Sequence, residues 1–453
     1  MLNNISKKNL YTTLLMISLP VFFGELFQIL YGFINSIWVS KIMGESYLDV
    51  LAILQPIILV ALGVVSAITS AVALKLGNYI GENNDDKVNI LIKSSYRMTF
   101  YICLILGIVV ALLSYIFINL LNIDSNLAKQ AFGYMFVFIL GLPICFLIAL
   151  ISKFYQSIGK TKVLLIVSVF GNVLNALFVP ILINGNSFLP RLGLSGAALS
   201  TLISQLIILV VLYYYTYRTN NRFCFSFKIE KDTTNKEIYS ISKLGLPLVG
   251  VEFIYAFMYF IIIAILEKSG YVTEYYIFTN VDTFLSLIPE VILITLPIIL
   301  CQLNGANMKD EMVVFSKNVL VYLIILYIFI IAIPVIVFSQ NIVGMYTDNK
   351  SLIEDVSFLI SISQICQVFY LISIVISSYL ESLGDTKKLF IANFMGVLML
   401  RPICIFLFTL SYGVVGIFLA SLCSNFVKMS ILILYYYNKR HTEKPYELGT
   451  IIE

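Results

Sequence analysis

The sequence has a single histidine and very little charge. The one imidazole, His441, lies in the basic stretch near the end of the chain. Haem enzymes, membrane metalloproteases and histidine-based acyl transferases need an imidazole inside the membrane, and the sequence excludes them. None of the seven cysteines forms a CxxC pair, which argues against a disulfide framework or a thiolate metal site. Charged residues make up 12% of the 453 residues, about half of their share in soluble domains.

Hydrophobic residues, in contrast, make up 60% of the chain, and the mean hydropathy is +0.96. A membrane-spanning helix needs about 20 predominantly apolar residues. Segments of that length lie near 15–40, 50–76, 96–118, 131–152, 163–184, 195–217, 246–266, 276–301, 318–338, 356–380, 389–410 and 414–437. The sequence therefore predicts an all-α membrane protein with twelve transmembrane helices.

Lysine and arginine are unevenly divided between the two predicted membrane faces. One face carries only Lys41, Lys129, Arg191, Lys268 and Lys350, and most of the others lie in segments that meet the opposite face. The positive-inside rule then places both termini in the cytoplasm, and an even number of spans agrees with this. No small-residue cleavage site follows a short apolar core at the start, so we expect the first span to be retained. We expect a multi-pass protein of the cell (plasma or inner) membrane.

The first and seventh spans share a proline near the start and a carboxylate inside. Pro20 and Glu25 recur at the same spacing as Pro247 and Glu252. Three further matches follow in the same order, and they pair Tyr79–Glu82 with Leu303–Ala306, Gln156–Lys162 with Glu381–Lys387, and Gly193–Ala197 with Gly413–Ile417. This order indicates a duplication. Because each half has six spans, we expect two six-helix lobes related by a pseudo-two-fold axis along the membrane normal.

A basic polar stretch separates the two halves. We assign residues 1–217 to an N-lobe, 218–243 to a cytoplasmic linker, and 244–453 to a C-lobe with a basic tail. The linker is interpreted as a solvated connection, and a partner-docking site or a short surface helix is the alternative. The matched prolines Pro20 and Pro247 are candidates for a bend or a hinge, since proline removes one helical hydrogen bond.

Short motifs are distributed along the chain at Pro20 with Leu30-Tyr31-Gly32-Phe33-Ile34-Asn35, Gly171-Asn172-Val173-Leu174-Asn175, Gly193 to Ser200, Gln302-Leu303-Asn304-Gly305-Ala306, and Leu383-Gly384-Asp385-Thr386. Through these motifs, and over nearly its whole length, the chain resembles the multidrug and toxic compound extrusion (MATE) transporters. Each motif is short, and it is their order, spacing and duplication that resemble the family. The resemblance implies twelve helices in two lobes and the export of organic, mostly cationic compounds, driven by the entry of protons or sodium.

The chain departs from the family pattern at its acidic positions. The aspartate that the family has in the first helix is Asn35 here, and the aspartate of its fifth helix is Val179. The family's seventh-helix glutamate would fall near Tyr255, one turn beyond Glu252, and its tenth-helix acid near Tyr370. The identity of the coupling ion, H⁺ or Na⁺, and its site therefore stay open.

Glu25 is the first candidate for ion coupling, because a carboxylate inside a membrane helix is costly and faces protein or water. The alternative is a protonated or hydrogen-bonded glutamate that fixes helix packing. Gln28, Tyr31 and Asn35 continue near one face of the same helix. The resemblance implies that Asn172 and Asn175 of the fifth span face Glu25, and the alternative is a hydrogen bond between helices. If these side chains share a cavity, Glu25, Asn35 and Asn175 are candidates for a sodium site.

In the second half Glu252 takes the place of Glu25, with Tyr255 and Tyr259 on the following turns. A carboxylate beside aromatic rings suits an organic cation, although most tyrosines in such a chain serve packing. Asp282 and Glu290 are candidates in the eighth span, and Asp282 is the closer of the two to the end of that span.

Arg401, Lys75 and Lys428 are basic residues that also lie inside predicted spans. Arg401 needs a partner if it is deep in the membrane, and Glu290 and Glu252 are candidates; otherwise its side chain extends to the interface. Lys75 and Lys428 lie near span ends, where we expect their amines to reach the headgroup region.

Four classes of protein compete for this pattern. The first is an exporter of small organic cations with H⁺ or Na⁺ as the coupling ion, with no other cofactor, no nucleic-acid partner, and a monomer as the working unit. The second is a flippase for a lipid-linked saccharide, which needs a strongly basic cavity where this chain offers several carboxylates. A membrane enzyme lacks a catalytic motif here. A channel would not account for the duplicated carboxylates.

Overall fold

The computed structural model describes residues 10–44, 46–120, 125–185, 190–225, 231–269 and 272–443, and these residues form helices and no strand. Twelve helical stretches within this part of the chain are long and apolar enough to cross a membrane. The predicted all-helical membrane fold is therefore confirmed. The chain divides into two compact units, Met1–Val249 (the N-unit) and Gly250–Glu453 (the C-unit), which we describe separately.

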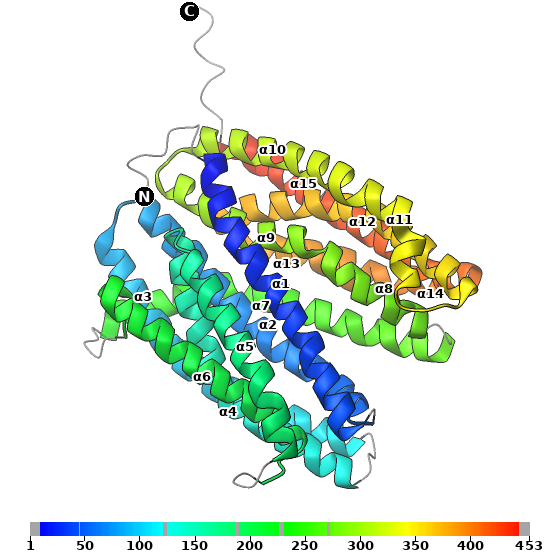
Figure 1. Ribbon diagram of the computed structural model, residues 1–453. Coiled ribbons are helices and arrows are strands. Elements are labelled where there is room, and N and C mark those ends of the chain that lie inside the picture. The colour runs from blue at the N-terminus through cyan, green and yellow to red at the C-terminus, as the bar shows by residue number, and fades with distance from the viewer. Residues whose placement is uncertain are drawn as a thin grey trace, which may run out of the picture. The chain divides into compact units, whose positions relative to one another are not determined.

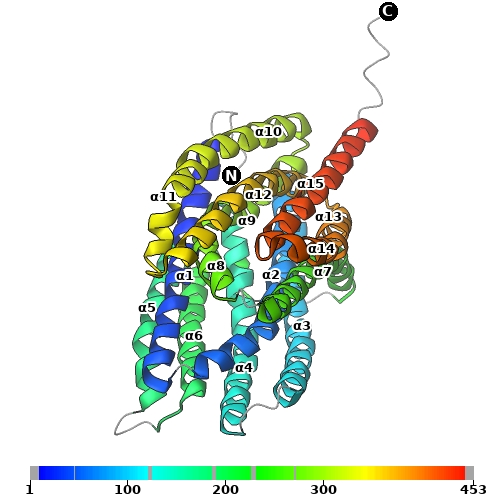
Figure 2. The same ribbon diagram turned by 90° about the vertical axis from the view of Figure 1, so that its right-hand side faces the viewer.

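The N-unit is a bundle in which α1 packs on α5 and α6, and α4 packs on α2, α3 and α6 (Figures 1 and 2). Its apolar core includes the buried aromatic side chains of Phe146, Phe154 and Tyr155 on α4. Its helices are α1 (Leu10–Met43), α2 (Ser46–Gly81), α3 (Asp85–Leu120), α4 (Ser125–Ser157), α5 (Lys162–Asn184), α6 (Leu194–Thr219) and the short η3 (Asn221–Phe223). Helix α7 (Lys231–Ser269) begins in this unit and ends in the next.

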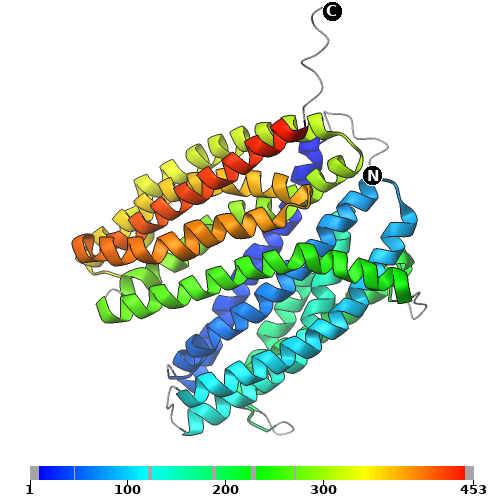
Figure 3. The same ribbon diagram turned by 180° about the vertical axis from the view of Figure 1, so that it is seen from behind.

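The C-unit is organised around α12, which packs on α8, α9, α10, α11 and α15 (Figure 3). Its elements are α8 (Val272–Leu285), α9 (Leu287–Gly305), α10 (Lys309–Leu326), the π-helix η4 (Tyr327–Ala332), α11 (Ile333–Gly344), α12 (Lys350–Ser382), α13 (Thr386–Asn393), the π-helix η5 (Phe394–Leu400), α14 (Arg401–Tyr412) and α15 (Val415–Glu443). The C-terminal part of α7 adds Ile254, Met258 and Ile262 to its core.

Proline explains why several spans are not regular helices. A proline ring clashes with the carbonyl four residues earlier and offers no N–H. Pro289 stands four residues after the last residue of α8, and the segment predicted as one continuous span, 276–301, is divided into α8 and α9 at Ser286. Likewise η4 precedes Pro334, and η5 precedes Pro402. The eighth predicted span is therefore present but is interrupted at Ser286.

The duplication predicted from the sequence is visible in matched turns. Gly193 and Gly413, which precede the last helix of each unit, have positive φ angles of 60° and 56°. Three residues later a Cβ on Gly196 or Gly416 would lie 2.4 Å from the backbone of the preceding helix, so only glycine permits that approach. Positive φ angles also recur at Gly159 with Gly384 and at Asn83 with Asn307.

The predicted linker, 218–243, overlaps the structure only in part. Residues 226–230 lie outside the described residues, and α7 is already helical from Lys231. The division into units falls inside α7, two residues after Pro247. The assignment of an N-lobe, a linker and a C-lobe stays a prediction.

Candidate functional site

Three helices of the N-unit meet at the hydroxyl of Thr201. The hydroxyl of Tyr31 on α1 shares a hydrogen bond of 3.0 Å with Thr201 Oγ1, and Nδ2 of Asn175 on α5 donates to the same atom at 3.0 Å. Thr201 belongs to α6 and is not among the site residues predicted from the sequence. Threonine hydroxyls in membrane helices commonly donate a hydrogen bond to a backbone carbonyl of the same helix, as Thr201 also does to Ala197. The presence of a threonine at this position therefore does not indicate a functional site.

Two amide carbonyl oxygens in the same part of the N-unit lack a donor. Oδ1 of Asn35 and Oδ1 of Asn175 are buried, and neither receives a hydrogen bond from the residues that the structure describes. Asn35 follows Tyr31 by about one turn and shares its face of α1. Carbonyl and hydroxyl oxygens are the groups that hard cations and coupling ions bind. We call Tyr31, Asn35, Asn175 and Thr201 the oxygen cluster.

Glu25 lies on α1 apart from the oxygen cluster. At 1.5 Å per residue it is about 9 Å from Tyr31 along the helix axis, and about 15 Å from Asn35. Its side chain is partly buried, and Lys153 of α4 is the charged residue that acts on it. Because the Glu25 and Asn35 side chains are too short to span 15 Å, one ion cannot contact both.

The other two candidate binding residues of the N-unit, Gln28 and Asn172, are not part of the oxygen cluster. Gln28 on α1 is exposed, and Asn172 on α5 is partly buried about one turn before Asn175. The described structure records no hydrogen bond to either side chain.

Three candidate carboxylates of the C-unit lie near enough to Tyr370 on α12 for their charges to act on its side chain. Glu252 of α7, Asp282 of α8 and Glu290 of α9 all act on its hydroxyl electrostatically. Asp282 also accepts a hydrogen bond of 3.4 Å from Nε2 of Gln367, which lies about one turn before Tyr370. The structure therefore places near one another three carboxylates that the sequence assigns to two spans, the seventh and the eighth, and that belong to α7, α8 and α9.

Tyr255 is part of a chain of hydrogen bonds in the same unit. Its hydroxyl donates to Oδ1 of Asn393 at 3.0 Å and accepts from Nζ of Lys428 at 2.8 Å. Lys428 is only 5% exposed, so the prediction that its amine reaches the headgroup region was wrong. The burial depends on the packing of η5 against α15, which the hydropathy pattern does not reveal.

Arg401 does not pair with the glutamates suggested for it. One guanidinium nitrogen donates to the hydroxyl of Ser421, and Nε is buried without an acceptor among the described residues. Asp282 is the carboxylate whose charge acts on it, and among the described residues the hydrogen bond recorded for its side chain goes to Ser421 rather than to a glutamate. Arg401 thus contributes positive charge near Asp282.

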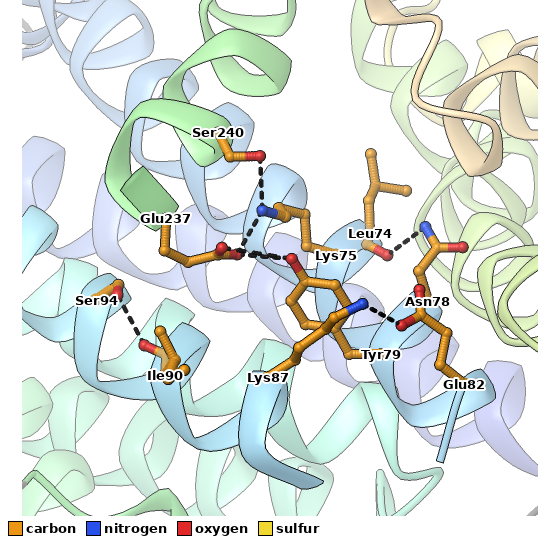
Figure 4. A network of polar contacts seen from close by, with 10 residues as sticks. All are labelled: Leu74, Lys75, Asn78, Tyr79, Glu82, Lys87, Ile90, Ser94, Glu237 and Ser240. Atoms are coloured by element: carbon orange, nitrogen blue, oxygen red, sulfur yellow. Dashed lines mark hydrogen bonds and ion pairs between the residues drawn. The ribbon is translucent and has the colours of Figure 1, made fainter. Parts of the chain in front are cut away.

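Lys75 of α2 is also buried, contrary to the prediction that its amine reaches the headgroups. It forms an ion pair with Glu237 at the start of α7 and donates to Ser240 at 2.7 Å (Figure 4). The hydroxyl of Tyr79 donates to the same carboxylate at 3.1 Å. This network lies within the N-unit and fixes the first turns of α7 to α2.

Known proteins share this sequence pattern and this architecture. The MatE family model matches residues 20–181 and again residues 247–407. The multidrug export protein MepA of Staphylococcus aureus is 22% identical over 98% of this chain and 97% of its own length. An outward-facing multidrug resistance MATE family transporter of the MOP superfamily has a TM-score of 0.85 at 14% identity, covering 95% of this chain and 96% of its own. The Vibrio cholerae MATE transporter VcmN has a TM-score of 0.85 at 17% identity, covering 97% and 98%.

A bundle of twelve spans, duplicated and carrying carboxylates inside its helices, defines a multi-pass membrane transporter of small molecules rather than an enzyme. The chain belongs to the MatE family. The resemblance seen in its short motifs is thereby confirmed.

Proposed function

We propose that this chain exports small organic cations from the cytoplasm by ion-coupled antiport with alternating access, as a monomer. The observation that carries the proposal is that Glu252, Asp282 and Glu290, from three helices of the C-unit, all lie near enough to Tyr370 for their charges to act on it. Several carboxylates in one part of a poorly hydrated interior attract an organic cation through charge. MepA, a multidrug export protein, supports the same direction of transport.

Two positions in the N-unit suit two different coupling ions. The oxygen cluster contains amides and hydroxyls, which do not titrate near neutral pH but can bind Na⁺ through oxygen. Glu25 is a carboxyl group, which can take up and release a proton. We propose that sodium coupling uses Asn35 and Asn175 and that proton coupling uses Glu25.

The test is ethidium efflux from proteoliposomes under an imposed proton gradient or an imposed sodium gradient. If protons drive transport, Glu25→Gln abolishes the gradient dependence and Asn175→Ala leaves it. If sodium drives transport, Asn175→Ala abolishes the gradient dependence and Glu25→Gln leaves it. Efflux that ignores both gradients would contradict antiport, and unchanged coupling in both variants would contradict these assignments.

The same proposal includes the orientation in the cell membrane with both termini in the cytoplasm, supported by the uneven distribution of Lys and Arg. The flippase alternative gains no support from the relatives named above. Accumulation of a lipid-linked glycan in cells that lack the gene, without loss of ethidium efflux, would favour it.

A further inference from the structure

The ammonium group of Lys428 is held by aromatic rings in the C-unit. Its Nζ lies 5.5 Å from the ring centroid of Tyr255 and 5.5 Å from that of Tyr370, and it donates to the Tyr255 hydroxyl at 2.8 Å. It forms no ion pair with a carboxylate within the part of the chain that the structure describes. The ammonium thus donates to the hydroxyl of one tyrosine and lies at cation–π distance from the ring of the other, and aromatic side chains of this kind are what proteins use to bind cationic ligands.

The close packing of η5 on α15 in this unit sets the position of Lys428. Gly396 lies in η5, and a Cβ there would be 3.0 Å from the Cβ of Lys428 and 3.0 Å from the carbonyl oxygen of Ser424. Glycine therefore lets η5 lie directly on α15 beside Lys428. Short π-helical segments such as η5 are frequent at functional sites. Asn393, at the end of α13, holds the Tyr255 hydroxyl from the other side at 3.0 Å.

The same ring of Tyr370 belongs to the region proposed above for the cationic substrate. Glu252, Asp282 and Glu290 act on its hydroxyl, while Lys428 occupies a position over its face. A second cation between Tyr255 and Tyr370 would meet the fixed charge of Lys428 at close range, where repulsion is strong in a poorly hydrated interior.

We propose that Lys428 determines specificity in the C-unit, because its ammonium is a tethered cation that fills the place between Tyr255 and Tyr370. A free organic cation cannot bind there while Lys428 is present. This inference rests on the proposed export of cations. It limits the cationic substrate to groups that fit beside the three carboxylates without displacing the lysine.

The experiment is equilibrium binding of radiolabelled tetraphenylphosphonium to the purified full-length chain in lipid nanodiscs. Lys428→Met removes the charge and keeps an apolar side chain of similar length. We expect this variant to gain one binding site per chain, or to bind about tenfold more tightly than wild type. If Lys428→Met does not fold, Lys428→Gln provides the same comparison.

Two control variants separate this role from general effects of charge. Lys428→Arg keeps a cation in place and is expected to bind like wild type. Lys388→Met removes another C-unit lysine, which pairs with Asp385 and lies 5.7 Å from the ring of Tyr435, and it should also bind like wild type.

The outcomes distinguish this inference from the proposed function. If wild type binds the probe and neither Lys428→Met nor Lys428→Gln changes the stoichiometry or the affinity, the inference is wrong. It is equally wrong if Lys388→Met produces the same gain. If the Lys428 variants gain a site while wild-type proteoliposomes transport no cation, the tethered-cation role stands and the proposed export is wrong.

Discussion

Asn35 is a polar side chain that the fold buries without satisfying it. Its Oδ1 receives no hydrogen bond from the described residues, and Oδ1 of Asn175 is in the same condition. An unpaired buried carbonyl costs about 1–3 kcal/mol of stability. A transporter that binds a cation through these oxygens recovers that free energy when the ion is present.

Replacing Asn35 with leucine therefore has two expected effects. The unfolding temperature without sodium should stay the same or rise, because the substitution removes the unpaired oxygen and keeps the volume. The stabilisation by sodium chloride relative to choline chloride should disappear. Thermal unfolding of the purified protein measures both quantities. Asn119→Leu, near the end of α3, serves as the control, and a sodium response retained by Asn35→Leu would contradict the proposed site.

The candidate residues show how far single positions can be interpreted from the sequence. The polar face of the first span predicted that Tyr31 and Asn35 belong together, because helical periodicity alone sets that relation. The partner Thr201 and the burial of Lys428 depend on contacts between helices distant in the chain. A lysine near the end of an apolar segment is equally compatible with burial and with extension to the headgroups.

At the scale of one element, α7 is attached to the N-unit by a buried ion pair. The side chains of Lys75 and Glu237 are 9% and 15% exposed, so their interaction is only weakly screened by water. Gly245 on the same helix lies against α2, where a Cβ would be 2.9 Å from the side chain of Ile68. The first half of α7 is thus packed and charge-paired against α2.

Glu237→Leu should destabilise the protein by about 3 kcal/mol, since it leaves the Lys75 charge buried without its counter-charge. The double variant Lys75→Met, Glu237→Leu should recover most of this loss. Chemical unfolding in detergent micelles provides the measurement. Lys87→Met breaks the exposed Lys87–Glu82 pair of Figure 4 and should cost less than about 1 kcal/mol. Equal losses for the two single variants would show that burial of the pair is unimportant.

Replacing Gly416 or Gly32 with alanine tests helix packing, because we expect the first change to lower the stability of the protein and the second to raise it. Gly416→Ala should destabilise the protein by about 1–3 kcal/mol, because its Cβ would lie 2.4 Å from the backbone of α14. Gly32→Ala should stabilise it by up to about 1 kcal/mol, because nothing lies within 4 Å of the added Cβ and alanine favours a helix. Unfolding midpoints of the two variants against wild type give the answer. Destabilisation by Gly32→Ala would show a contact that the structure lacks.

For the whole molecule, the sequence predicted the fold better than the details of its helices. A transmembrane helix can be predicted from its length and hydropathy alone. Lipid cannot hydrogen-bond the backbone, so a long apolar segment in the membrane has to be helical. The twelve predicted segments are therefore found as helical stretches. The break at Ser286 and the two π-helices were not predicted, since Pro289, Pro334 and Pro402 could equally have kinked a continuous helix.

The orientation of the molecule follows from charge rather than from packing, so it needs its own test. Lys160 and Lys129 lie at opposite ends of α4 and are both exposed. In a variant whose native cysteines are replaced by serine, we expect Lys129→Cys to react with a membrane-impermeant maleimide in intact cells. Lys160→Cys should react only after the membrane is opened, because the excess of lysine and arginine predicts that its turn lies in the cytoplasm. The reverse labelling pattern would mean that the termini face outward, and that export by this chain would have to run from the other side.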